Sequence, residues 1–251
     1  IAIINSQTNT IVCNKAEGKL NNLKNNLENI EIPGTVGIGH TRWATHGKPD
    51  IKNAHPHIDT LGEVAVVQNG IIENYQELKI KLEKEGIVFN SDTDTEVIPH
   101  LIQKELFALS QLKLENNGST LLVAVRNVIS DLEGSYALAV LWSGAPDSLV
   151  VARRQAPLII GLGEGEFICA SDTPAIANFT KIILPLEDEE IALLTPLGIE
   201  IYDSNNERQY RNPISLQIAE QVIDKNNFRH YMLKEIYDQP EIAKYWLEKY
   251  L

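Results

Sequence analysis

Residues 135–171, SYALAVLWSGAPDSLVVARRQAPLIIGLGEGEFICAS, decide the fold class. The apolar runs in this stretch are short, and Gly, Pro or Asp residues bound them. With two similar runs that follow, strands are predicted at 135–142, 148–153, 158–163, 166–171, 181–186 and 190–195. Turns fall about every eight to twelve residues, which is the spacing typical of an antiparallel β structure.

The residues before this strand-rich region predict mainly helices. Apolar residues at helical spacing predict helices over 15–29, 71–86 and 121–132, and a capping-box pattern predicts one that starts at Thr93–Glu96. Strands are predicted at 1–5, 10–14, 35–41 and 64–67, the last closed by an Asn69-Gly70 turn. Because strands and helices do not alternate regularly, the pattern favours an α+β fold over a doubly wound sheet.

Composition narrows the class of protein further. The length of 251 residues is enough for one large or two small domains, and with 43% hydrophobic and 22% charged residues the chain has enough apolar mass for a sizeable core. The net charge is −12, and Lys and Arg form no basic patch for nucleic acid. The two cysteines, Cys13 and Cys169, make no disulfide framework, and neither a signal peptide nor a membrane span is visible. We expect a cytoplasmic protein without nucleic-acid or membrane partners.

Both ends of the chain carry expectations of their own. The sequence begins at Ile1, already inside a strand-like run, so we expect the natural chain to begin earlier. Residues 204–227 are polar and predict a linker, and residues 228–251 predict a helix that breaks at Pro240.

Polar residues with binding chemistry concentrate in HTRWATHG (40–47) and NAHPH (53–57). An arginine in a pocket binds a carboxylate through two parallel N–H bonds, which makes Arg42 a candidate ligand for a carboxylate. The ordinary structural alternative is a surface arginine that covers a packed tryptophan.

The histidines of this region also suggest a metal hydrolase built on His46, His55, His57 and Asp59. Zinc requires three or four converging ligands with supporting hydrogen bonds. No later His or Asp set completes the pattern at a recognisable spacing. We therefore predict no metal and histidines that are hydrogen-bonded structural groups.

Two further positions offer catalytic or binding chemistry. The Asn69 side-chain amide and the Gly70 backbone N–H are two donors that could hold a developing oxyanion, although an Asn-Gly turn explains them equally well. Asp94 lies near a predicted helix N-terminus, where the dipole stabilises a carboxylate that could also bind a substrate ammonium. Cys13 and Cys169 lie in apolar strand-like runs and are expected to be inert.

Taken in order, HTRWATHG, NAHPH, NGIIEN and TDTEVI resemble the class II glutamine amidotransferase domain of glucosamine-6-phosphate synthase (glutamine–fructose-6-phosphate aminotransferase). LEGSYALAV, ARRQAPLIIGLGEGEFICASD and RHYMLKEIYDQP extend the resemblance over nearly the whole chain. It implies a four-layer α/β/β/α sandwich of two antiparallel sheets, with an N-terminal strand and helix missing. Residues 1–226 would form the glutaminase domain, and residues 227–251 would lead to an absent sugar-isomerase domain.

The resemblance also implies a role for each motif. Arg42 would bind the α-carboxylate of L-glutamine and Asp94 its α-ammonium, while Asn69 and Gly70 would form the oxyanion hole. Gln68 departs from the pattern, because the family often has histidine before Asn-Gly. The substrate pocket or its covering loop would also include Trp43, Thr45 and His46.

The family's nucleophile is an N-terminal cysteine whose own α-amino group serves as the base. This sequence lacks that residue, and Cys13 does not align with it, so the fragment as given is expected to be inactive. The full enzyme would be a homodimer through its isomerase domain. It would use glutamine and fructose 6-phosphate without a cofactor. The alternative is a glutamine-binding or assembly module that has lost its nucleophile.

Overall fold

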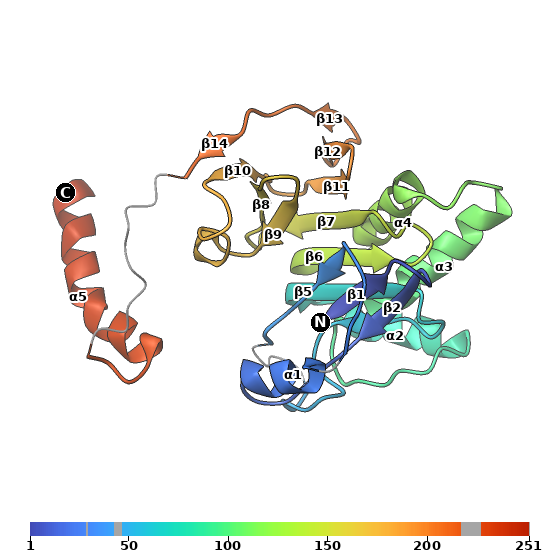
Figure 1. Ribbon diagram of the computed structural model, residues 1–251, viewed down its shortest axis with the longest axis horizontal. Helices are drawn as coiled ribbons and strands as arrows, with labels where there is room; N and C mark the ends of the chain where they lie inside the picture. The colour runs from blue at the N-terminus through green and yellow to red at the C-terminus, as the bar shows by residue number, and fades with distance from the viewer. Residues whose placement is uncertain (29, 43–46, 217–226, 251) are drawn as a thin grey trace. The chain divides into compact units, whose positions relative to one another are not determined.

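The computed structural model describes residues 1–28, 30–42, 47–216 and 227–250 (Figure 1). The chain divides into two compact units, Ile1–Ser215 and Leu216–Leu251. The first unit contains all of the described strands, and the second contains a single described helix, α5 (Tyr231–Tyr250). In the described ranges, no helix is both long and apolar enough to cross a bilayer.

A seven-stranded antiparallel sheet forms the centre of the first unit (Figure 1). In spatial order its strands are β13 (Arg208–Gln209), β12 (Gly198–Tyr202), β11 (Ile191–Thr195), β7 (Leu149–Arg154), β6 (Gly134–Trp142), β5 (Val64–Ile72) and β4 (His57–Ile58). β5 and β6 pair along nine residues, with Val64 opposite Trp142 and Ile72 opposite Gly134. This long pairing fixes the register of the strand that carries Asn69 and Gly70.

Two smaller antiparallel sheets form a second layer. One contains β2 (Thr10–Cys13), β1 (Ala2–Asn5) and β3 (Gly37–Ile38), and the other contains β14 (Ile214–Ser215), β10 (Ile182–Pro185), β8 (Ile159–Leu162) and β9 (Phe167–Ala170). Alternate residues of the central strands, such as Ala65, Val67 and Leu141, pack against this layer. The two-residue period of a strand therefore sends one set of side chains into a core between sheets.

The opposite set of side chains packs against helices. This layer contains α2 (Tyr75–Lys84), α3 (Val97–Gln111) and α4 (Gly118–Ser130). Val66 and Leu138 of the sheet share a buried cluster with Ile98 and Val125 of the helices. The remaining helices of the described first unit are α1 (Leu20–Leu27), which buries no side chain, and the 3-10 turn η1 (Thr173–Ala175). The predicted α+β class and the antiparallel sandwich are confirmed.

The predicted turn at Asn69-Gly70 is wrong, because β5 continues through it to Ile72. Gly70 has a φ of +121°, and a Cβ there would lie 2.0 Å from the Ser135 carbonyl oxygen of the neighbouring strand. Close packing of two backbones, rather than a turn, therefore requires glycine at this position. Ile71, predicted to begin the next helix, also belongs to β5. A short apolar run fits either a strand or a helix, so the pattern alone could not place it.

The predicted capping box is also wrong. α3 begins at Val97, not at Thr93, and no side chain caps its N-terminus. The Glu96 carboxylate instead accepts the backbone N–H groups of Asn90 and Ser91, at 2.8 and 2.6 Å. Glu96 thus stabilises the loop that precedes the helix.

Most of the other predicted elements form, although two of them are shorter than predicted. All six strands predicted from residue 135 onward form, as do the hairpin at 1–5 and 10–14 and the helix predicted at 121–132, which is α4. The helix predicted at 15–29 is shortened to α1, since Gly18 has a φ of +80° just before it. The strand predicted at 35–41 is reduced to β3.

The C-terminal predictions need two corrections. The linker predicted at 204–227 includes β13 and β14, which pair with β12 and β10; residues 217–226 lie outside the described residues. α5 also runs through Pro240 instead of breaking there. Proline removes one backbone donor but has a helical φ, so the turns on either side hold the helix together.

Candidate active site

A cavity of about 320 Å³ brings together the predicted site residues that the structure describes. Its lining includes Asn69 and Gly70 from β5, Asp94 from the loop before α3, and Arg42 from the segment after β3. A cation, an anion and two candidate hydrogen-bond donors from three separate segments therefore border one space. The predictions for Trp43, Thr45 and His46 lie outside the described residues.

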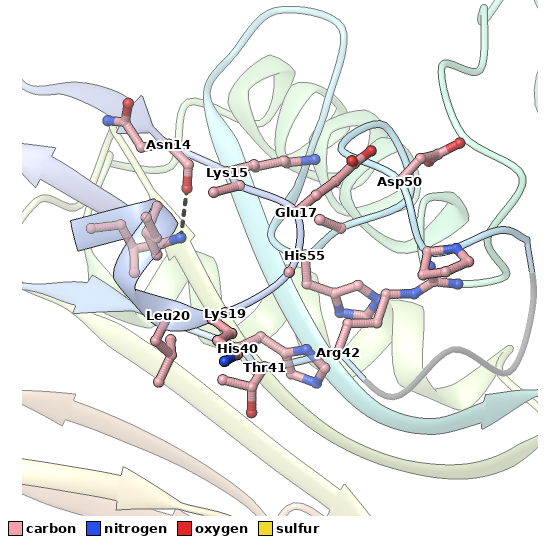
Figure 2. Close-up of a pocket in the computed structure, with 16 residues that line it drawn as sticks. Asn14, Lys15, Glu17, Lys19, Leu20, His40, Thr41, Arg42, Asp50 and His55 are labelled. Carbon is pink, nitrogen blue, oxygen red and sulfur yellow. Dashed lines mark hydrogen bonds between the residues drawn. The ribbon is translucent and has the colours of Figure 1, made fainter. Parts of the chain in front are cut away.

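A second cavity of about 170 Å³ shares His40, Arg42 and His55 with the first (Figure 2). Lys15 also lines it, and burial lowers the pKa of this ammonium. The backbone nitrogen of Ile1 donates to the Asn14 carbonyl oxygen at 2.8 Å, shown as the dashed line in Figure 2. The histidine and arginine residues thus form a boundary between two neighbouring spaces.

Asp94 is held by the end of β5. Its side chain is 3% exposed, and Oδ2 accepts the backbone N–H of Ile72 at 2.8 Å. A carboxylate anchored in this way keeps a fixed position at the cavity wall. This geometry suits recognition of a small cationic group.

Arg42 is half-buried, and its guanidinium donates to the loop that follows it. Nη1 donates to the Lys48 carbonyl oxygen at 3.0 Å and Nη2 to the Gly47 carbonyl oxygen at 3.4 Å. These contacts fix the plane of a group whose fork of N–H donors matches a carboxylate.

Asn69 is contacted by His40 across 29 residues of sequence, with 2.7 Å between His40 Nε2 and Asn69 Oδ1. Since a carbonyl oxygen only accepts, the imidazole donates from Nε2. The His40 ring stacks on His55, with ring centroids 4.4 Å apart and planes 21° apart. Burial lowers the pKa of His40, so the ring is neutral near pH 7.

His55, which lines the cavity, and His57 form a neutral, buried pair with ring centroids 4.9 Å apart. Burial is the main reason that the pKa of His55 falls to about 2 and that of His57 to about 3. His55 Nδ1 accepts the backbone N–H of Gln68 at 3.3 Å, and His57 Nε2 lies 3.0 Å from Thr93 Oγ1. These contacts match the prediction of hydrogen-bonded structural histidines.

The metal-hydrolase alternative gains no support from the neighbouring carboxylate. The Asp59 oxygens accept three backbone N–H groups, from Leu61, Glu63 and Val64, at 2.7 to 2.8 Å. Within the described ranges, no three His, Cys, Asp or Glu side chains gather as metal ligands. His46, which that hypothesis also needs, lies outside them.

The two cysteines, Cys13 and Cys169, are free and half-buried. Burial raises the pKa of both thiols, that of Cys169 to about 12. Both therefore stay protonated at neutral pH, in agreement with the prediction that they are inert.

Sequence reasoning missed the contacts that support the site. Gln68 is 3% exposed, and its Oε1 accepts from Thr95 Oγ1 at 2.8 Å, which links β5 to the segment next to Asp94. Neither Thr95 nor His40 was a candidate, because nothing in the local pattern marks them. Their only signal is membership of the TDTEVI and HTRWATHG motifs.

The chain belongs to the glutamine amidotransferase domain family, because the model of that family matches residues 40–178. A glutamine–fructose-6-phosphate aminotransferase (isomerizing) of Thermosynechococcus vestitus is 52% identical over 241 residues, which is 96% of this chain and 38% of the relative. The enzyme of the same name from a Nostoc species is 54% identical over 240 residues, with the same coverage. The chain therefore spans 38% of the length of these relatives.

Solved structures support the fold assignment. A glutamine phosphoribosylpyrophosphate amidotransferase from B. subtilis superposes with a TM-score of 0.52 at 27% identity, covering 69% of this chain and 34% of that chain. A structure described as the allosteric regulatory enzyme of purine biosynthesis gives a TM-score of 0.53 at 27% identity, covering 69% and 35%. Both likenesses support the antiparallel α+β sandwich.

Proposed function

We propose that this chain is the glutamine-hydrolysing domain of a glutamine–fructose-6-phosphate aminotransferase. The observation that carries the proposal is the single cavity bordered by Arg42, Asn69, Gly70 and Asp94, in a chain that is 52% identical to such an enzyme over 241 residues. The domain would release ammonia from L-glutamine for transfer to fructose 6-phosphate.

The chemistry of the cavity is complementary to L-glutamine. The Arg42 guanidinium binds the α-carboxylate through paired N–H donors, and the Asp94 carboxylate binds the α-ammonium. The Asn69 side-chain amide and the Gly70 backbone N–H bind the oxygen of the side-chain amide. Trp43, Thr45 and His46 complete the pocket or its cover, as the family resemblance implies.

The reaction proceeds by acyl transfer through a thioester. A cysteine thiolate attacks the side-chain amide carbon of glutamine, and negative charge develops on the amide oxygen, where Asn69 and Gly70 stabilise it. The C–N bond breaks, the nitrogen takes up a proton and ammonia leaves. Water then attacks the thioester, which regenerates the thiol and frees glutamate. By the family resemblance, the nucleophile is an N-terminal cysteine that is not among residues 1–251.

The whole enzyme would join fructose 6-phosphate and glutamine to give glucosamine 6-phosphate and glutamate. Residues 1–226 would be its glutaminase domain, and residues 227–251 would lead to the sugar-isomerase domain through which two copies associate. A cytoplasmic location without nucleic-acid or membrane partners belongs to the same proposal. The two free cysteines and the net charge of −12 support it.

The test is glutamate release from L-glutamine by the full-length gene product, with and without fructose 6-phosphate. We expect release that rises with the sugar phosphate, together with formation of glucosamine 6-phosphate. A folded full-length protein that binds glutamine but releases no glutamate would instead support the alternative of a glutamine-binding module.

A further inference from the structure

The orientation of the Asn69 amide depends on one neighbour. The Asn69 side chain ends in an oxygen and a nitrogen of nearly equal size, and only the nitrogen can donate to an oxyanion. A half-turn of the amide would instead present Oδ1 to the developing negative charge, which is repulsive. The side chain therefore contributes to the oxyanion hole only if something selects one of these two orientations.

We propose that His40 is a positioning residue that fixes the Asn69 amide with its nitrogen directed to the oxyanion. The proposal rests on the proposed function. Its basis is the 2.7 Å contact between His40 Nε2 and Asn69 Oδ1 at the wall of the cavity of about 320 Å³. An N–H at Nε2 attracts the amide oxygen and repels the amide NH2, so it selects the productive orientation.

The surroundings of His40 place its proton on Nε2. The other ring nitrogen, Nδ1, is buried and has no partner at hydrogen-bond geometry among the described residues. The Gln68 backbone is the smallest of the influences on the His40 pKa, behind the Asn69 side chain. An N–H at Nδ1 would lose its hydrogen bond to water without replacement, whereas Nε2 has an acceptor. The neutral tautomer with the proton on Nε2 is therefore favoured.

The ring itself is also held in place. His40 stacks on His55, and His55 Nδ1 accepts the backbone N–H of Gln68, the residue directly before Asn69. The His40 ring is thus tied to the strand that carries its acceptor. A donor held on both sides aligns the amide before substrate arrives, which is the condition for electrostatic preorganisation.

The experiment compares two replacements of His40 in the full-length gene product. His40→Phe keeps a ring to stack on His55 but removes the donor, and His40→Gln keeps an N–H donor without the ring. We expect His40→Phe to lower kcat for glutamate release roughly 10- to 100-fold with little change in the glutamine KM. His40→Gln should recover part of the loss.

A double substitution separates positioning from a general structural effect. In an Asn69→Ala background the amide is absent, so adding His40→Phe should cause no further loss of kcat. Independent losses that multiply in the double variant would overturn the proposal, and so would an unchanged kcat in His40→Phe.

A spectroscopic measurement tests the geometry without catalysis. In ¹⁵N-histidine-labelled protein, the His40 Nε2 should be protonated and Nδ1 bare at neutral pH, and the opposite tautomer would overturn the inference. If the wild-type protein releases no glutamate, the proposed function fails. The labelling measurement still decides whether His40 donates a hydrogen bond from Nε2 to Asn69.

Discussion

At the scale of single residues, the guanidinium of Arg42 contacts the Lys48 and Gly47 carbonyl oxygens, and the proposed function makes it a binding group rather than a catalytic one. Under the proposed function its guanidinium would face the non-reacting end of glutamine, so its loss should weaken the ground state and the transition state alike. We expect Arg42→Ala to raise the glutamine KM roughly 100-fold, from a loss of about 3 kcal/mol, with kcat little changed. Steady-state glutaminase kinetics on the full-length protein measure both constants.

The matched control for Arg42 is lysine. Arg42→Lys retains the charge but not the planar fork, so its KM should lie between those of the wild type and Arg42→Ala. A kcat that falls as much as KM rises would contradict a role confined to binding.

The proposed function places Asn69 at the reacting end of the substrate, so its substitution should show the opposite pattern. Removal of one oxyanion donor typically lowers kcat roughly 100- to 1,000-fold, and we expect this for Asn69→Ala with a nearly unchanged KM. Asn69→Asp is the isosteric comparison, and it should be worse because a carboxylate repels the developing charge. Equal effects of the Asn69 and Arg42 substitutions on both constants would refute the separate roles.

At the scale of elements, the bond between Gln68 and Thr95 joins β5 to the segment next to Asp94. Thr95→Val keeps the shape of the side chain but leaves the buried Gln68 Oε1 without its donor, which should cost about 1–3 kcal/mol of unfolding free energy. The glutamine affinity should fall as well, because Asp94 is the adjacent residue. Denaturant unfolding and equilibrium binding measure the two effects.

A double variant distinguishes this bond from simple loss of packing. Gln68→Met replaces the amide with an apolar side chain of similar length, so no amide oxygen at position 68 is left unsatisfied when it is combined with Thr95→Val. The contact of Thr95 Oγ1 with His55 Nε2, at 3.4 Å, is lost in both variants that carry Thr95→Val and therefore cancels in their comparison. The double variant should therefore be more stable than Thr95→Val alone. A double variant that loses the sum of the two single effects would exclude the coupling.

The elements that sequence patterns predict well are those whose signal is local. The strands from residue 135 onward are short apolar runs between turn residues, and all six form. The failures at Asn69-Gly70 and at Thr93–Glu96 share another cause. Glycine is required at position 70 by the Ser135 carbonyl of the next strand, and Glu96 bonds backward into its own loop. The Ser135 carbonyl is far from Gly70 in the sequence, and the groups that Glu96 contacts, although close in the sequence, are backbone N–H groups that no pattern of side chains reveals.

At the scale of the whole molecule, the same division applies to the candidate site. The charges and donors of the motifs at 40–47 and 93–98 could be identified from the sequence, through their resemblance to a family. The His40–Asn69 and Gln68–Thr95 bonds join residues 29 and 27 positions apart, and only the completed sandwich brings them together. The supporting contacts are thus a property of the fold, whereas the binding chemistry is a property of the motifs.

The buried histidines make the stability of the first unit depend on pH. The pKa values of His55 and His57, about 2 and about 3, lie below the usual value of 6.5, so the unfolded chain binds protons more readily. Their contribution is complete above about pH 6.5 and is lost as the pH falls toward these lower values. Between about pH 7 and pH 5, the unfolding free energy should decrease by roughly 2 kcal/mol for each histidine.

His57→Gln tests this dependence, because glutamine can still bond Thr93 but does not titrate. Denaturant unfolding at pH 7 and at pH 5 gives the loss for each protein, and the variant should lose roughly 2 kcal/mol less than the wild type. Any general destabilisation by the substitution cancels, because only the change with pH is compared. Burial raises the pKa of Glu96, but the hydrogen bonds from the Asn90 and Ser91 N–H groups and the nearby His100 ring, 3.7 Å away, outweigh it and hold the pKa at about 2. This carboxylate therefore adds its own loss only below about pH 4.5, outside the window. Equal losses in the two proteins would show that His57 is not held neutral by the fold.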